Sequence, residues 1–265
     1  MTVENSAVGN TCNLCGNTDF VPLIEREGMI VVRCETCGLA FTHPQPEETA
    51  NQYGEDYFGL YARRSEFRKR RMTRRLRCIE TLIPGKGRIL DIGCSLGYFL
   101  EVASAKGWEP YGVDISSYAA EQVRKKGFDA RACPLEKAEY SDGFFDCVTM
   151  WDTLEHVPDP SLHMREVGRI LKDGGLVVIG TPNIGHPAFR FRQDGWRHLK
   201  PAEHLYYFNY STIAKLLKKT GFRQTWPRLC KSASYVHFAA GFSQWMGRLL
   251  RANDMMLVYG FKTEQ

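Results

Sequence analysis

The most informative segment of the chain is Ile89-Leu90-Asp91-Ile92-Gly93-Cys94-Ser95-Leu96-Gly97-Tyr98-Phe99. An apolar run of strand length enters a turn marked by two glycines, and an apolar helical pattern leaves it. Twenty-one residues after Gly93, a second apolar run ends in Asp114. A glycine turn between strand and helix, with an acid at the end of the next strand, is typical of α/β domains that bind a nucleoside.

Strand and helix patterns alternate from residue 88 onward. The expected strands are 88–92, 110–114, 129–133, 145–151, 176–181, 222–226 and 255–261. One expected helix follows the glycine turn and ends near residue 106. The others span 117–126, 162–171 and 212–220. This alternation predicts a Rossmann-like α/β fold, in which a mostly parallel seven-stranded sheet carries helices on both faces.

The turn favours a cationic cofactor over a dinucleotide. Ser95 stands where a dinucleotide fingerprint has its middle glycine, and the carboxylate of Asp91 would repel a pyrophosphate. Asp114 can accept hydrogen bonds from both hydroxyls of a ribose. S-adenosylmethionine carries an ammonium and a sulfonium but no phosphate, so it fits this pattern.

With these motifs, residues 88–265 resemble a class I S-adenosylmethionine-dependent methyltransferase. The motifs occur in the order of that family: the turn with Asp91, Gly93 and Gly97, the ribose acid Asp114, Phe145-Asp146, the segment 151–160, the segment 171–175, Thr181-Pro182-Asn183, and His204-Leu205-Tyr206-Tyr207-Phe208.

The resemblance implies a cofactor site. Its members would be Asp91, Gly93, Cys94, Gly97, Tyr98, Asp114, Ile115, Leu135 and Trp151. In that family's arrangement, Asp91 helps to hold the amino group and Asp114 takes the ribose hydroxyls. Ile115 and Leu135 would flank the adenine, and Trp151 would line the methionine side.

An oxygen acceptor needs a general base, and histidine is the natural candidate at neutral pH. The resemblance places Glu155 and His156 near the acceptor, while His204 lies in an insertion at about 184–210 that we expect to be a substrate lid. We therefore expect His156 or His204 to be the base. A hydrogen-bonded structural role is the alternative for each.

Two Cys-x-x-Cys pairs precede this domain. Cys12, Cys15, Cys34 and Cys37 have eighteen residues between the pairs, which predicts a four-cysteine zinc site. Four thiolates leave no open position on the metal, so the zinc would be structural; a vestigial or redox role is the alternative. Such a zinc-ribbon front end also resembles a subset of bacterial methyltransferases, some of which act on sugars and secondary metabolites.

These motifs divide the chain into a zinc-ribbon module at 1–46, an aromatic and basic helical linker at 47–87, and the methyltransferase domain at 88–265. Residues 63–77 hold nine Lys or Arg and one Glu, a net of +8, so the rest of the chain sums to −3. The helix expected over 62–83 has apolar residues on one face and arginines on the other. That basic face would be solvated, bind an anion or contact RNA.

The favoured function is methylation of a small molecule, a sugar or secondary metabolite, most simply on oxygen. One alternative is an RNA methyltransferase that docks through the zinc ribbon and the basic helix. The other is a non-catalytic module that only binds S-adenosylmethionine. We find no secretory signal and no run long enough to cross a membrane, so we expect a soluble cytoplasmic protein. The oligomeric state stays open.

Overall fold

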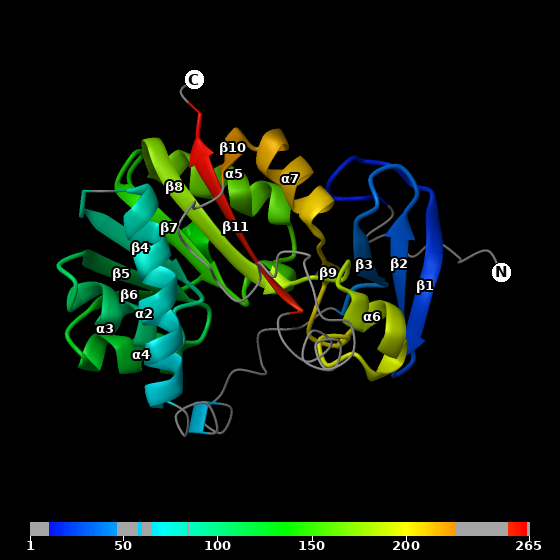
Figure 1. Cartoon of the computed structure of the whole chain (residues 1–265), viewed down its shortest axis with the longest axis horizontal. Helices are drawn as coiled ribbons and strands as arrows, with labels where there is room; N and C mark the ends of the chain where they lie inside the picture. The colour runs from blue at the N-terminus through cyan, green and yellow to red at the C-terminus, as the bar shows by residue number, and fades with distance from the viewer. Residues whose placement is uncertain (1–10, 47–57, 60–64, 84, 226–253, 264–265) are drawn as a thin grey trace, which may run out of the picture.

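The computed structural model describes residues 11–46, 58–59, 65–83, 85–225 and 254–263. Its large sheet has seven strands in the order β10-β11-β8-β7-β4-β5-β6 (Figure 1). These strands are β4 (Arg88–Ile92), β5 (Glu109–Asp114), β6 (Asp129–Ala132), β7 (Phe145–Trp151), β8 (Leu171–Pro182), β10 (Phe222–Thr225) and β11 (Met255–Lys262). Only β11 runs antiparallel to its neighbours, β8 and β10. The predicted mostly parallel sheet is confirmed.

Helices cover both faces of this sheet. Apolar residues of α2 (Ser65–Leu82), α3 (Tyr98–Ser104) and α4 (Ser117–Lys125) pack on one face, and those of α5 (Pro160–Ile170) and α7 (Tyr210–Lys219) on the other. Local sequence sets where they begin. The side chains of Ser116, Asp159 and Asn209 accept hydrogen bonds from backbone N–H groups in the first turns of α4, α5 and α7.

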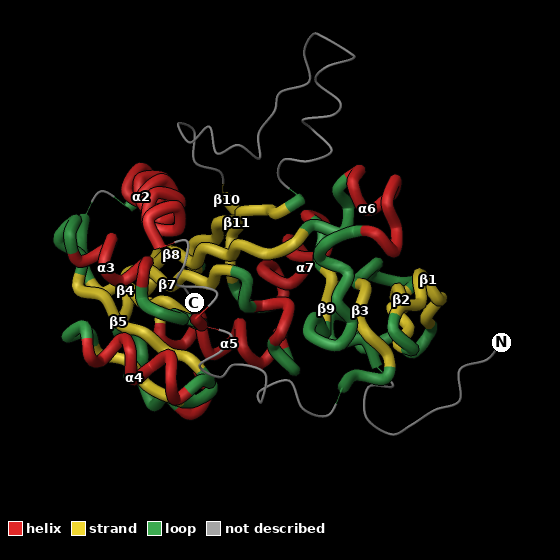
Figure 2. Tube along the Cα trace, turned by 90° about the horizontal axis from the view of Figure 1, so that it is seen from below, coloured by secondary structure: helices red, strands yellow, loops and turns green. Residues whose placement is uncertain are grey.

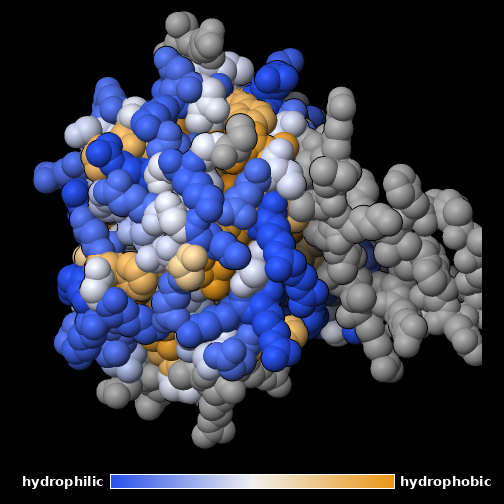
Figure 3. All heavy atoms as spheres, turned by 60° about the vertical axis from the view of Figure 1, so that its left-hand side comes forward, coloured by the Kyte–Doolittle hydropathy of each residue, from blue (hydrophilic) through white to orange (hydrophobic). Residues whose placement is uncertain are grey.

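The basic helix α2 corrects one expectation. Its outer side does carry charge, and the face of the molecule shown in Figure 3 is largely hydrophilic with small separate apolar areas. Arg75, however, is buried between Met72 and Ile79, and its guanidinium lies 4.4 Å from the ring centre of Trp151. Its position on α2 is beside the apolar stripe of the helix. There the face of the Trp151 ring compensates for the hydration that the guanidinium loses on burial.

A second sheet contains four strands in the order β1-β2-β3-β9. The first three come from the cysteine-rich region: β1 (Phe20–Arg26), β2 (Met29–Cys34) and β3 (Ala40–His43). The fourth, β9 (Tyr206–Tyr207), belongs to the segment expected to be a lid, which also forms α6 (Pro187–Arg192) and the 3-10 turn η4 (Gln193–Gly195). Figures 1 and 2 show β9 and α6 beside this sheet.

Both faces of the small sheet are covered, since side chains alternate along its strands. Val31, Ala40 and Tyr207 pack against the insertion. Val32 and Phe41 join the core formed by α5, α7 and the large sheet. The cysteine-rich region therefore shares one hydrophobic core with the large sheet, although the division at residues 46 and 87 itself stays a prediction. Among the described residues, no helix is both long and apolar enough to cross a membrane.

Candidate active site

The glycine turn joins the carboxyl end of β4 to α3. Gly93 and Gly97 have φ angles of 71° and 75°, and Ser95 between them has a φ of 50°. A Cβ on Gly93 would lie 2.5 Å from Thr153 Oγ1, so a side chain is excluded by space as well as by conformation. The turn is consequently fixed in a shape that leaves its backbone close to any ligand at this edge.

Asp114 ends the neighbouring strand β5 and holds the turn in place. Its two carboxylate oxygens accept hydrogen bonds from Ser95 N and Ser116 N, both at 2.9 Å. A carboxylate has about four acceptor positions, so two remain for ribose hydroxyls. Burial raises its pKa, and the two N–H donors oppose that shift. The next residue, Ile115, is 47% exposed, as expected of a surface that an adenine would cover.

Asp91 lies in a buried group of side chains at the end of β4. It accepts a hydrogen bond of 2.7 Å from Thr149 Oγ1, and burial raises its pKa, opposed by that bond and by the charge of Arg75. Trp151 packs between Arg75 and Phe99. Its Nε1 and the Oγ of Ser95 are buried and have no hydrogen-bond partner among the described residues. Buried polar atoms without a partner are expected where a bound ligand supplies the missing hydrogen bonds.

Three other predicted cofactor residues, Cys94, Tyr98 and Leu135, are also buried. Cys94 packs its thiol into an apolar cluster with Leu100, so only its backbone can face a ligand. Tyr98 is buried against Leu96 and Phe58, and Leu135, at the start of the 3-10 turn η2 (Leu135–Lys137), is 2% exposed. Their direct contact with a cofactor stays a prediction.

The structure brings the three predicted catalytic side chains together. One ligand atom from each of Glu155, His156 and His204 lies within 4.8 Å of the others, so the group could hold a proton or a metal ion. The histidine ring centres are 4.8 Å apart. Glu155 Oε2 accepts a 2.9 Å hydrogen bond from Thr181 Oγ1. Two strand ends, those of β7 and β8, and the insertion thus meet at this cluster.

The protonation states of the cluster differ. Burial and the charge of Asp152 raise the pKa of Glu155 to about 8, so its carboxyl is largely protonated at neutral pH. Burial lowers the pKa of His156, and it lowers that of His204 far below its usual range. His156 Nδ1 lies 2.8 Å from Glu203 O. Because a carbonyl only accepts, Nδ1 carries the hydrogen and the lone pair lies on Nε2.

A buried carboxylate anchors the insertion. Asp254, at the start of β11, accepts hydrogen bonds from Trp196 Nε1 at 2.9 Å and from Arg197, and it lies 3.3 Å from His198 Nε2. Burial raises its pKa, but the donors around it outweigh burial and hold the pKa far below its usual range. The segment expected to be a lid is therefore tied to the large sheet.

The four predicted zinc ligands converge. The sulfur atoms of Cys12 and Cys37 are 3.4 Å apart, those of Cys15 and Cys34 are 3.5 Å apart, and all four lie within 4.8 Å of one another. Tetrahedral zinc with bonds of about 2.3 Å requires sulfur separations of about 3.8 Å, so the group fits that metal. Hydrogen bonds from the Cys37 backbone and neighbouring groups outweigh burial and lower the pKa of Cys34 to about 7, whereas burial raises the pKa of Cys12 and that of Cys37, the latter to about 11. The thiolate is therefore favoured at Cys34, and the positive charge of a bound metal would be needed to favour it at the other two.

Hydrogen bonds join this cysteine cluster to the active-site elements. Asn13, between two of the ligands, donates to Asp159 Oδ1 at 2.8 Å and accepts from Ser161 N at 3.0 Å. Thr42 Oγ1 donates to His204 O at 2.8 Å. Asp159 and Ser161 start α5, directly after the segment of His156. The cluster therefore braces both chain segments that carry the candidate histidines.

Sequence reasoning missed Ser95, Arg75 and Asp254 as parts of the site. Arg75 could have been found from its place on the apolar stripe of α2. Ser95 stands out in the sequence only as a departure from a dinucleotide motif. Asp254 gave no local signal, because its partners lie 57 and 58 residues away in the chain.

The family model that matches this chain is described as a methyltransferase domain and covers residues 64–225. A ubiquinone biosynthesis O-methyltransferase of Bordetella avium is 33% identical over 111 residues, which are 39% of this chain and 46% of the relative. The chain spans about half the length of the curated relatives it matches.

Solved structures share the fold. A SAM-dependent methyltransferase of Archaeoglobus fulgidus has a TM-score of 0.55 at 22% identity, covering 78% of this chain and 100% of that chain. A methyltransferase of Haloferax volcanii, solved in complex with the Trm112 methyltransferase activator, has a TM-score of 0.57 at 15% identity, covering 79% of this chain and 97% of that chain.

Proposed function

The chain belongs to the methyltransferase domain family, and on this premise we propose that it transfers the methyl group of S-adenosylmethionine to a hydroxyl oxygen of a small molecule. The observation that carries the proposal is one shared edge of the sheet. Asp114 and the glycine turn lie at the carboxyl ends of β4 and β5, and Glu155-His156 follows the adjacent strand β7. Relatives named as O-methyltransferases support oxygen as the acceptor atom.

The cofactor would lie along the turn. Asp114 would take the ribose hydroxyls, Ile115 would face the adenine, and Asp91 with Trp151 would line the methionine end. When bound, S-adenosylmethionine supplies a methyl group that its sulfonium already activates. The protein then contributes mainly orientation, which is worth ~7–11 kcal/mol in well-aligned reactions.

His156 is the better of the two candidate bases. Its Nδ1–H is held by Glu203 O, and Nε2 can accept the hydroxyl proton as the acceptor oxygen bonds to the methyl carbon. The electron pair of the broken S–C bond stays on sulfur. His204 is so strongly desolvated that protonation is unfavourable there, so we assign it to shaping the pocket. A bound zinc at the cysteine cluster would stabilise the fold and supply no step.

The acceptor would be a sugar or a secondary metabolite. RNA is the less favoured acceptor, because some cations of α2 are already paired within the chain: Lys69 with Glu101 at 2.5 Å and Arg71 with Asp152 at 3.4 Å. A non-catalytic module is also less favoured, since it has no need for the Glu155, His156 and His204 group.

The first test is calorimetric titration with S-adenosylhomocysteine of wild type and Asp114→Ala. We expect micromolar binding by the wild type and loss of at least tenfold in the variant, because two ribose hydrogen bonds disappear. Asp173→Ala, which removes an exposed carboxylate from the other end of β8, is the matched control and should bind normally. Absence of binding by folded, zinc-loaded wild type would overturn the proposal.

A further inference from the structure

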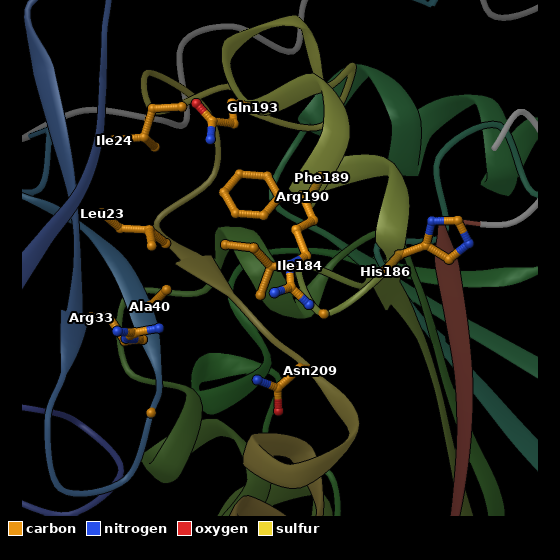
Figure 4. Close-up of a pocket in the computed structure, with 12 residues that line it drawn as sticks. Leu23, Ile24, Arg33, Ala40, Ile184, His186, Phe189, Arg190, Gln193 and Asn209 are labelled. Carbon is orange, nitrogen blue, oxygen red and sulfur yellow. The ribbon is translucent and has the colours of Figure 1, made fainter.

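A cavity of about 470 Å³ lies between the small sheet and the insertion, and none of the predicted cofactor or catalytic residues lines it (Figure 4). Its size is within the range of about 300–1,000 Å³ that small-molecule sites occupy. One wall comes from β1, β2 and β3, and the other from the segment that follows β8, including α6. The cavity therefore exists only because the insertion folds over the small sheet.

The lining divides into an apolar part and a cationic part. Leu23, Ile24, Ile184 and Phe189 supply apolar surface, and they belong to one hydrophobic cluster. Arg33 and Arg190 also line the cavity, from opposite walls, and no Asp or Glu is among the lining residues. Figure 4 shows Arg33 on the strand side and Arg190 on the α6 side.

The two arginine side chains of this cavity are exposed and have no partner within the described part of the chain. Neither arginine forms an ion pair or a side-chain hydrogen bond among the described residues. This distinguishes them from Arg26, Arg169 and Arg197, which pair with acids. Asn209 adds an amide: its Oδ1 accepts from Thr212 N at 3.0 Å, which leaves the NH₂ group to donate, and Figure 4 shows that group on the cavity side.

We propose that this cavity binds a small molecule with an anionic group and an apolar body, the anion held by Arg33, Arg190 and Asn209 and the body by the apolar wall. Two unpaired guanidinium groups and an amide match the oxygens of a phosphate, sulfonate or carboxylate. A ligand there would bridge β2 and α6 and so hold the insertion against the small sheet. The site shares no residue with the cofactor turn, so it does not depend on methyl transfer.

The probe is 1-naphthyl phosphate, titrated by its own fluorescence, with neutral 1-naphthol as the matched ligand. We expect saturable binding of the phosphate and at least tenfold weaker binding of the naphthol. Arg33→Ala and Arg190→Ala should each weaken phosphate binding about tenfold, the order of one charge-assisted hydrogen bond. Arg165→Ala removes an equal charge from an exposed site on α5 and should change little.

Each variant is checked by thermal unfolding and by S-adenosylhomocysteine titration, both of which should match the wild type. Unchanged phosphate binding in the Arg33→Ala, Arg190→Ala double variant would overturn the proposal. An equal loss in Arg165→Ala would also overturn it, since attraction would then be non-specific. Failure of the wild type to bind S-adenosylhomocysteine would sink the proposed methyl transfer and leave this site standing.

Discussion

At the scale of single residues, burial decides the chemistry of Glu155. Its side chain is 1% exposed, and Asp152 adds a like charge, so the folded protein keeps it protonated to about pH 8. In the unfolded chain the same carboxyl ionises near its ordinary pKa of 4.5. Between these two values the folded state binds more protons, so Glu155 makes stability fall as pH rises.

Glu155→Gln should therefore gain stability relative to the wild type as pH rises. The amide cannot ionise, so the wild type alone loses up to about 1.4 kcal/mol per pH unit between the two pKa values. Urea unfolding at about pH 5 and about pH 9 measures the difference. An equal free-energy gap between the two proteins at both pH values would contradict the raised pKa.

His156→Ala should lower methyl transfer by about 10²–10⁴, the usual contribution of a general base, without changing S-adenosylhomocysteine affinity. Because the pKa of His156 lies below its ordinary 6.5, wild-type kcat/KM should stay level through neutral pH and fall only on the acid side. His204→Ala should lose less. The rate of methyl transfer to a panel of phenols and sugars is measured for the wild type and both variants. Full turnover by His156→Ala would rule out His156 as the base.

At the scale of elements, α5 begins against the cysteine cluster. Its first turn is capped by Asp159, and that carboxylate also accepts from Asn13, so the loop carrying His156 is fixed at its far end. Leu205 N donates to Glu155 O at 2.9 Å, which ties the insertion to the same loop. The candidate base thus depends on contacts from elements distant in sequence.

Asn13→Ala should destabilise the protein by about 1–3 kcal/mol, because it leaves Ser161 N without its acceptor and removes one of the two donors to Asp159, whose bond from Leu162 N remains. Asn17→Ala is the control in the same module: it loses only two longer contacts, 3.3 Å to Asp19 O and 4.0 Å to Cys34 Sγ, so a smaller change is expected. Denaturant unfolding compares the two. Equal, small effects would mean that the contact between Asn13 and α5 carries no stability.

At the scale of the whole molecule, the cysteine cluster and the active site share one structure. Strand β3 pairs with β9 through Ala40–Tyr207 and Phe41–Tyr206, and β9 begins two residues after His204. Loss of order in the small sheet would therefore release the insertion. Asp114 ends β5 of the large sheet, and the hydrogen bonds that it accepts come from Ser95 N in the glycine turn and from Ser116 N, both outside the small sheet.

Removal of zinc with a chelator should lower the melting temperature and increase amide hydrogen exchange both at 12–43 and at 203–208. S-adenosylhomocysteine affinity should change by less than about threefold, because the cofactor turn is braced by the large sheet. Hydrogen exchange with mass spectrometry, with and without added Zn²⁺, measures this. Exchange confined to 12–43 would contradict the coupling between the two regions.

The large sheet, its glycine turn and the convergence of the four cysteines could all be predicted from the amino-acid sequence. These features rest on short-range patterns: apolar periodicity, glycines that need a positive φ, and pairs of thiols two residues apart. The sequence also brought Glu155, His156 and His204 forward as candidates through motif order, and the structure places them together.

The three-dimensional structure alone shows that His156 Nδ1 lies against Glu203 O, that Arg75 is buried, and that β9 completes the small sheet. Only it revealed the clamp at Asp254 and the cavity with Arg33 and Arg190. The physical reason is that desolvation, charge pairing and strand partnership are set by residues far apart in the chain, and no local pattern records which of them will meet.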